Sequence, residues 1–187
     1  DAKSHSGTVV SFDNEIIRID LQAATNKSVT VFGQTEITKE LYLEQDKLNA
    51  KILHNVRKVT PTDFREKAPR VTFENSDGKV KEVIGDFIIG CDGFHGVSRS
   101  CLPETEKKIY ENVYPFGWLG ILSETPPVHH ELIYSNSQKG FALASMRNEN
   151  LSRYYIQCPS HSSPDDYPDE YFWEALKSRL PDEFSSK

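Results

Sequence analysis

Five polar side chains in the second half of the sequence have types and spacings that suit recognition of a small organic anion. On an extended strand, residues two apart project from one face, so Ser145 shares a face with Arg147, and Arg153 shares one with Tyr155. A guanidinium can clamp a carboxylate through two parallel hydrogen bonds, so Arg147 could bind one with help from Ser145 and Tyr155. Tyr134 could hydrogen-bond a phenol. An ordinary half-exposed strand pair would show the same pattern.

A second candidate site is the segment GCDGFHGVSR, which follows a short apolar run. In α/β folds, nucleotides bind beyond the carboxyl ends of the strands, where Asp92 could accept hydrogen bonds from ribose hydroxyls. Gly93 and Gly96 would let the backbone approach a pyrophosphate closely. His95 and Arg99 would offer positive charge to a phosphate. The alternative is a tight turn with a capping Asp92 and solvated basic side chains.

Other kinds of chemistry have weaker support. His129 and His130 are adjacent, and no nearby thiol or carboxylate spacing accompanies them, so no metal site is expected. The three cysteines, Cys91, Cys101 and Cys158, are odd in number and widely spaced. They fit neither a disulfide framework nor a zinc site, and reduced thiols are expected.

The elements that would position these side chains begin with a hairpin. Apolar residues alternate loosely over residues 8–21 and predict two strands joined at Asp13–Asn14. Residues 29–32 predict another strand. Thr35 as N-cap and apolar residues at helical spacing predict a helix through residue 49. A strand over residues 51–56 would then complete a β-α-β unit.

The middle of the chain predicts further strands. Asp77–Gly78 lies between the alternating runs 71–73 and 80–83, a strong hairpin signal. The continuous apolar run 87–91 predicts a strand buried on both faces, which would end at Asp92.

Beyond Pro103 the sequence predicts an antiparallel sheet and a terminal helix. No long helical pattern interrupts the aromatic-rich runs, which are separated by short polar turns. An amphipathic helix over residues 169–180 is predicted to stop at Pro181. The predicted strands of this sheet are residues 110–122, 131–134, 140–146 and 153–158.

Composition narrows the class of protein. The 187 residues suffice for one ordinary domain or two small ones, and 37% of them are hydrophobic, enough for a packed core. A net charge of -6 without a basic run argues against nucleic acid as a partner. No apolar run has membrane-spanning length, and the polar start DAKSHSG is not a signal peptide. A cytoplasmic protein without a membrane partner is expected.

Several motifs together resemble the class A flavoprotein monooxygenases, which are flavin-dependent aromatic hydroxylases. GCDGFHGVSR resembles the Asp-Gly fingerprint that contacts both FAD and NAD(P)H in this family. The stretches YPFGWLGILSETPPVHHELIYSN, GFALASMR and SRYYIQ resemble the substrate-binding strands of members that hydroxylate 4-hydroxybenzoate. GQTE at residues 33–36 also matches. The similarity covers essentially the whole chain.

The resemblance implies a mixed α+β fold: an antiparallel substrate-binding sheet plus part of an α/β FAD-binding domain of the glutathione-reductase type. Residues 1–32 would supply strands of the substrate-binding domain, and residues 33–110 would form the partial FAD-binding domain. Residues 111–187 would complete the substrate-binding sheet and add the terminal helix. A homodimer is left open, since members of the family tend to dimerise.

The resemblance also implies roles for residues around the substrate. Tyr134 would hydrogen-bond the substrate phenol and assist its ionisation. Arg153 would lie near the flavin, and His5 would stand at the solvent end of a proton relay from the phenol. The residues implied to bind the substrate carboxylate are Ser145, Arg147 and Tyr155.

The implied cofactor is FAD, reduced by NAD(P)H, and the reaction would place one atom of O2 ortho to the phenol of an aromatic acid. Gln34, Asp92 and Gly93 would contact FAD, while His95 and Arg99 would face NAD(P)H. The family's GxGxxG motif and its C-terminal Gly-Asp segment are missing from the sequence. The chain is therefore expected to be an internal portion that is inactive alone.

Two other interpretations remain open at this stage. The first is a stand-alone module that binds aromatic carboxylates or nucleotides without redox activity. The second is a related hydroxylase that acts on 3-hydroxybenzoate or another phenol.

Overall fold

The computed structural model describes residues 2–186, which divide into two compact units. One, here called the sheet unit, contains the chain up to Lys47 and again from Val113 onward. The other, here called the central unit, contains Leu48–Asn112. Within residues 2–186, no helix is both long enough and apolar enough to cross a membrane.

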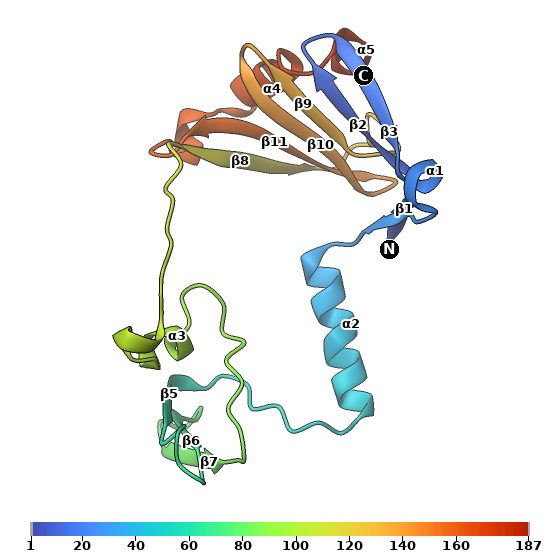
Figure 1. The fold of residues 1–187 in the computed structure, drawn as a ribbon. Helices are drawn as coiled ribbons and strands as arrows, with labels where there is room; N and C mark the ends of the chain where they lie inside the picture. Colours follow the sequence, from blue (N-terminus) through green and yellow to red (C-terminus); the bar gives the residue numbers. More distant parts are fainter. Residues whose placement is uncertain (1, 187) are drawn as a thin grey trace. The chain divides into compact units, whose positions relative to one another are not determined.

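The sheet unit is built around a six-stranded sheet in the order β3-β2-β9-β10-β11-β8 (Figure 1). Neighbouring strands are antiparallel except β2 and β9, which are parallel. The antiparallel arrangement predicted for the second half of the chain is confirmed, and the parallel pair joins it to the N-terminal hairpin. The strands are β2 (Gly7–Phe12), β3 (Glu15–Asp20), β8 (Phe116–Ser123), β9 (Ile133–Ser137), β10 (Gly140–Asn148) and β11 (Leu151–Pro159).

Local turn chemistry explains the N-terminal part of this unit. Asp13 has a positive φ of 51°, the left-handed conformation that Asp tolerates, and it turns β2 into β3 as predicted. Helix α1 (Leu21–Thr25) follows, capped by the Asp20 carboxylate, which accepts a hydrogen bond from the Ala23 amide at 2.8 Å. The predicted strand after it is β4 (Val29–Val31), which pairs antiparallel with β1 (Lys3–His5).

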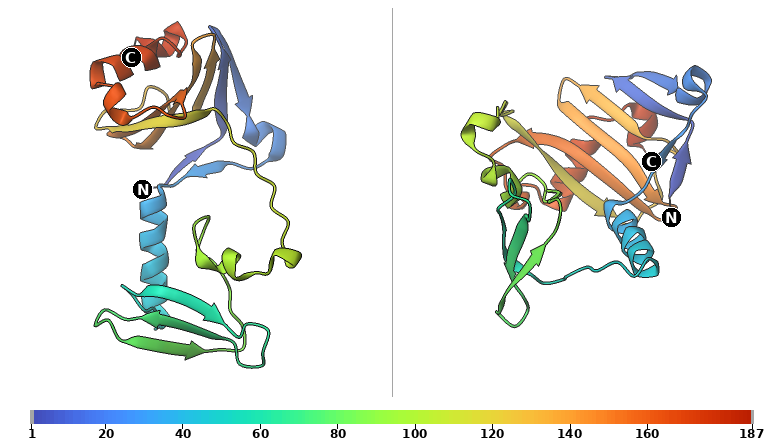
Figure 2. Two further views of the ribbon diagram at one scale, coloured as in Figure 1. Left: turned by 90° about the vertical axis from the view of Figure 1, so that its left-hand side faces the viewer. Right: turned by 60° about the horizontal axis from the view of Figure 1, so that its bottom comes forward.

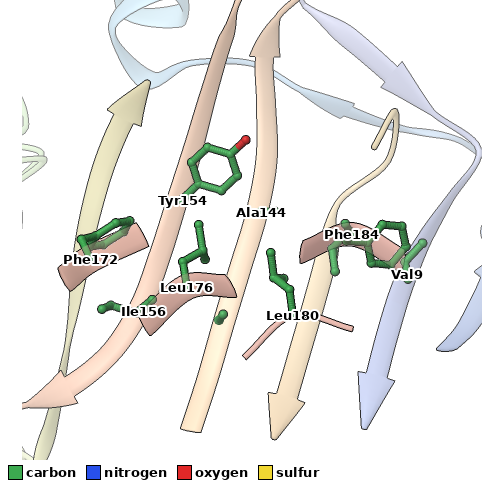
Figure 3. Packing of buried hydrophobic residues seen from close by; sticks show 10 residues of the cluster. Val9, Ala144, Tyr154, Ile156, Phe172, Leu176, Leu180 and Phe184 are labelled. Atoms are coloured by element: carbon green, nitrogen blue, oxygen red, sulfur yellow. The ribbon is translucent and has the colours of Figure 1, made fainter. Parts of the chain in front are cut away.

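One face of the six-stranded sheet is covered by helices α4 (Asp169–Lys177) and α5 (Asp182–Ser185) (Figure 2). A short 3-10 turn, η2 (Pro164–Asp166), precedes them. Phe172 and Leu176, four residues apart, face the sheet from α4, as the amphipathic pattern predicted. Figure 3 shows the core that results, with Leu180 and Phe184 continuing it beside Val9, Ala144, Tyr154 and Ile156.

The terminal helix is shorter than predicted. It ends at Lys177 rather than at residue 180, and Pro181 stands at the N-cap of α5. Proline cannot donate a backbone hydrogen bond, so it suits the start of a helix better than its interior. The pattern predicted one helix because Leu180 keeps the apolar spacing across the break.

Helix α2 (Gln34–Lys47) begins two residues earlier than predicted. The amide of Ile37 donates to the Gly33 carbonyl at 3.0 Å, so Thr35 already lies in the first turn and is not the N-cap. None of its residues is buried within the described chain.

The central unit is a three-stranded antiparallel sheet of β5 (Arg57–Thr62), β6 (Arg70–Glu74) and β7 (Val80–Ile84). The predicted β6–β7 hairpin is confirmed, and Gly78 takes the positive φ of 75° that its turn requires. Helix α3 (Val97–Cys101) and the 3-10 turn η1 (Glu104–Glu106) follow.

Two strands predicted within the central unit are absent from the described chain. A third predicted strand, β8 of the sheet unit, begins later than predicted. Residues 51–56 and 87–91 form no strand, and β8 starts at Phe116 rather than at residue 110. Phe87 is 88% exposed, whereas burial on both faces was predicted. A strand exists through hydrogen bonds to a neighbouring strand, and no strand in residues 2–186 pairs with either segment. Apolar content therefore predicted these strands without specifying their partners.

Candidate functional site

The register of the six-stranded sheet gathers the predicted substrate-binding side chains on the face opposite α4 and α5. Tyr134 pairs with Leu143, which pairs with Tyr155, and Tyr155 pairs with Gly120. On the next rung Ser145 pairs with Arg153. Because neighbouring positions such as Ala144 and Tyr154 belong to the core, these side chains alternate away from it.

A cavity of about 670 Å³ opens on this face of the sheet unit. Arg147, Arg153 and Tyr155 line it together with Gln34 from the first turn of α2. Its floor and walls include Gly120, Leu122 and Leu151, and its rim includes Glu36. Two predicted substrate-binding residues, the predicted catalytic residue Arg153 and one predicted FAD contact therefore meet in one place.

The cavity carries positive charge. The guanidinium carbon of Arg153 lies 4.5 Å from the centre of the Tyr155 ring, a cation–π contact. Burial lowers the pKa of Arg153, and the nearby charge of Arg147 lowers it further. Within residues 2–186 neither guanidinium forms an ion pair with a carboxylate. A bound anion would relieve the repulsion between them.

Ser145 and Tyr134 share this face but do not line the cavity. Ser145 is buried, and its hydroxyl donates to the Arg153 carbonyl at 3.2 Å, so it would have to rotate to donate to a ligand. Tyr134 is 37% exposed, and its ring centre lies 6.4 Å from that of Phe141.

His5 lies elsewhere, at the end of β1, and it does not line the cavity. It is only 3% exposed, whereas a solvent-end position was expected, and neither ring nitrogen has a hydrogen-bond partner within residues 2–186. Burial lowers the pKa of His5; the charge of Glu131 opposes that shift, and His130 and His129 add to it.

An ion pair with a buried carboxylate, which the sequence did not reveal, stands beside His5. Glu131 is 1% exposed, and its two carboxylate oxygens accept hydrogen bonds from Arg18 Nε and Nη2, each at 2.8 Å. Ser6 Oγ donates to the same carboxylate at 3.2 Å. The Arg18 hydrogen bonds hold the pKa of Glu131 below its ordinary value. A partner 113 residues away leaves no local sequence signal.

The Asp-Gly loop lies in the central unit and lines a second cavity, also of about 670 Å³. Asp92 Oδ2 accepts a hydrogen bond from the Ser98 amide at 2.9 Å, which lowers the pKa of Asp92. A β-carbon at Gly96 would come within 2.0 Å of Asp92 Cγ, so glycine there lets Asp92 fold back onto the start of α3. The capping alternative for Asp92 is thus what this loop adopts.

The two basic residues of the loop differ. Arg99 lines the second cavity, and its guanidinium carbon lies 5.2 Å from the centre of the Phe94 ring. His95 does not line it; its ring packs edge-on against Phe94 at 4.9 Å. The structure therefore brings Asp92, Gly93 and Arg99 together and leaves His95 on the outside of the loop.

A close approach within the cavity lining that sequence reasoning missed is the one at Gly120 in β8. A β-carbon at this residue would lie 2.4 Å from Tyr155 Cε1. The signal was present, since a glycine inside a strand often marks a close approach by another group.

Comparison with solved structures places this arrangement among flavoprotein folds. PqsL of Pseudomonas aeruginosa, solved in complex with 2-aminobenzoylacetate, superposes with a TM-score of 0.77 at 16% identity, over 99% of this chain and 51% of PqsL. A flavoprotein/dehydrogenase of Cytophaga hutchinsonii gives 0.69 at 15% identity, over 97% of this chain and 48% of that one. The predicted mixed fold is confirmed.

The chain belongs to the family described as FAD binding domain, whose model matches residues 1–187. It is 47% identical over 184 residues to the p-hydroxybenzoate hydroxylase of Acinetobacter baylyi. That match covers 98% of this chain and 45% of the hydroxylase, so the chain spans about half the length of the relatives it matches.

The loop residues fit part of the FAD that this family implies. Gly93 has a positive φ of 71°, and no atom lies within 4 Å of where its β-carbon would be, so its backbone is open to a ligand. The Asp92 carboxylate can accept hydrogen bonds from hydroxyl groups, and the Arg99 guanidinium can meet a phosphate. In the sheet unit, the Gln34 amide offers a donor and an acceptor at the first cavity.

Proposed function

We propose that the chain carries the substrate-binding sheet and part of the flavin site of a FAD-dependent monooxygenase. Its substrate is 4-hydroxybenzoate, hydroxylated ortho to the phenol to give 3,4-dihydroxybenzoate. NAD(P)H supplies two electrons, and O2 supplies one oxygen atom to the ring and one to water. The 47% identity to a p-hydroxybenzoate hydroxylase supports this choice of substrate.

The observation that carries the proposal is the unpaired positive charge in the first cavity. Arg147 and Arg153 meet there without an ion-pair partner in residues 2–186, beside Tyr155 and two leucines. An aromatic acid satisfies both features, because its carboxylate pairs with a guanidinium and its ring packs against apolar walls.

The residues of the sheet face divide the work of binding and proton transfer. Arg147 holds the carboxylate through two hydrogen bonds, with Tyr155 and a rotated Ser145 hydroxyl as further donors. Tyr134 hydrogen-bonds the phenol, and the positive charge of Arg153 favours the phenolate form. His5 takes part in carrying the phenol proton away, since an imidazole has two ring nitrogens and can take up a proton at one and release it from the other.

FAD, when bound, would supply the transfer of two electrons and the activation of O2. Gln34 of the sheet unit would contact it, as would Asp92 and Gly93 of the central unit, while His95 and Arg99 would offer counter-charges to the phosphates of NAD(P)H. Leu122 and Leu151 line the cavity and offer apolar contacts to the substrate ring.

The test is isothermal titration of the flavin-loaded holoenzyme with 4-hydroxybenzoate and with its neutral isostere, 4-hydroxybenzamide. Wild type should prefer the carboxylate, and Arg147→Lys should weaken carboxylate binding by roughly 10- to 100-fold while sparing the amide. The control is Lys139→Ala, which removes an exposed positive charge from the β9–β10 turn.

Product analysis completes the test. NAD(P)H oxidation should yield one 3,4-dihydroxybenzoate per O2 consumed in wild type. Equal affinity for the acid and the amide would contradict the assigned substrate class. Tight carboxylate binding without any hydroxylated product would instead support the binding-module interpretation.

A further inference from the structure

The ring of Tyr155 occupies space that a side chain at Gly120 would fill. The two residues pair across β8 and β11. A β-carbon at Gly120 would lie 2.4 Å from Tyr155 Cε1, 2.6 Å from Cδ1 and 3.3 Å from Cζ. The first two distances are far inside van der Waals contact, so the ring could not keep its place beside any other residue type.

Backbone conformation does not explain this glycine. Gly120 does not adopt a positive φ, unlike Gly78, Gly93 and Gly140. A glycine inside a strand costs stability relative to alanine, because the unfolded chain is freer and no side chain packs. The reason for a glycine at this position is therefore the space that it leaves for the Tyr155 ring.

The position of the Tyr155 ring in turn sets that of a charge. Arg153 projects from the same face of β11 two residues away, and its guanidinium stacks on the ring at 4.5 Å. Both side chains line the first cavity. Gly120 therefore leaves room for the Tyr155 ring, and that ring in turn positions the Arg153 guanidinium.

We propose that Gly120 is a specificity-determining position: it seats Tyr155, a donor to the substrate carboxylate, and with it the neighbouring Arg153, so that the cavity selects an aromatic carboxylate over a neutral analogue. The inference rests on the proposed function, since it concerns how that same cavity chooses its substrate. Gly120 has no side chain with which to bind a carboxylate, so it acts through Tyr155 as a positioning residue.

The variant that tests this is Gly120→Ala in the flavin-loaded holoenzyme. Strand β8 supplies a matched control: at Gly117 a β-carbon would meet only ordinary contacts, at 3.9 Å from Ser160 Cα and 4.0 Å from Cys158 Sγ. Gly117→Ala therefore makes the same chemical change in the same strand without displacing a ring.

The first measurement is the ratio of dissociation constants for 4-hydroxybenzoate and 4-hydroxybenzamide by isothermal titration. Gly120→Ala should weaken carboxylate binding roughly tenfold or more, as expected for one misplaced charge-assisted hydrogen bond, with little change for the amide. Gly117→Ala should keep the wild-type ratio. An unchanged ratio in Gly120→Ala would overturn the inference.

The second measurement separates ring placement from general damage to the strand. In a Tyr155→Ala background, Gly120→Ala should have no further effect on the ratio, because the ring it displaces is gone. The Nε–H resonance of Arg153, which the Tyr155 ring current shifts, should move in Gly120→Ala and stay in Gly117→Ala without any substrate. A further loss in the Tyr155→Ala background, or an unmoved resonance, would overturn the inference.

Failure of the proposed function looks different. If wild type binds the acid and the amide equally, the substrate assignment fails, and the specificity inference falls with it. If wild type prefers the acid and Gly120→Ala prefers it as strongly, the inference alone is wrong.

Discussion

The sheet unit and the central unit hold their candidate site residues in different ways. In the sheet unit, Tyr134, Arg153 and Tyr155 stand on paired strands, and their face is fixed by the register of β8 to β11. In the central unit, Asp92 stands in a segment that pairs with no strand in residues 2–186 and is held by its hydrogen bond to the Ser98 amide. Hydrogen bonds between paired strands position the site residues of the sheet unit, whereas one side-chain hydrogen bond at the start of α3 positions Asp92 in the central unit.

Burial follows the same division. The sheet unit has a core of ten buried apolar residues, including Ile133, Ile156 and Phe172. In the central unit Phe73 is the buried apolar side chain of the described core, while Phe87 is largely exposed. The backbone that carries the site on the sheet should therefore lose its geometry only when the core fails, whereas the Asp-Gly loop should respond to single hydrogen bonds.

The largest expected difference between the units comes from matched phenylalanine substitutions. Phe172→Ala should lower the free energy of unfolding by about 3–5 kcal/mol, because it removes a buried ring and leaves a cavity. Phe87→Ala should change it by less than about 0.5 kcal/mol, since that ring is exposed. Urea denaturation of the purified protein measures both. Equal losses would mean that the two units do not differ in burial as described.

A smaller difference is expected between an ion pair with a buried carboxylate and an ion pair with an exposed one. Glu131→Gln removes the charge that accepts two hydrogen bonds from Arg18 and should cost about 1.5–3 kcal/mol. In the central unit, Glu82 pairs with Arg70 at 3.1 Å near the surface, and Glu82→Gln should cost about 0–1 kcal/mol. Salt titration sharpens the contrast, because the pair with the exposed carboxylate should weaken more at high ionic strength.

Sequence patterns predicted the elements that local chemistry specifies. The turns at Asp13 and Asp77–Gly78 were predicted correctly, because their conformations favour these residue types whatever surrounds them. The run 87–91 was predicted as a buried strand, but apolar content cannot name the strand that would pair with it. The terminal helix was predicted to continue as far as Pro181, because Leu180 preserves the apolar spacing, but it ends at Lys177.

The same limit applies to the candidate site. Alternation alone predicted that Arg153 shares a face with Tyr155, and the register confirms that both lie on the face opposite the core. The Arg18–Glu131 pair and the seat of Tyr155 on Gly120 depend on which strands become neighbours. Register of that kind is set by the whole sheet and cannot be read from one segment.

Acidification should weaken the sheet unit through His5. Burial keeps the folded-state pKa of His5 below its ordinary value of about 6.5. As pH falls below that value, the unfolded chain binds a proton that the folded chain does not, so stability present above about pH 6.5 is lost, at up to about 1.4 kcal/mol per pH unit. Glu131 acts in the same direction, but only in a lower window, below about pH 4.3.

Denaturation curves between pH 7.5 and 5 should show this slope. His5→Gln should flatten it, since the variant has no buried imidazole to protonate. His95→Gln in the central unit removes a histidine that is exposed, and the slope should persist. A slope that is the same in wild type and His5→Gln would exclude His5 as its source.

The smallest expected effect is local to the Asp-Gly loop. Asp92→Ala removes the acceptor of the Ser98 amide at the start of α3, so hydrogen exchange at that amide should become several-fold faster. Amides of Ile133 and Ile156 in the sheet unit should keep their rates, because their hydrogen bonds belong to a paired ladder. Asp86→Ala is the matched control, since Asp86 lines the same cavity without capping α3. If Asp92→Ala accelerated exchange in both units alike, the loop would be coupled to the sheet core, and the contrast between a cap and a ladder would fail.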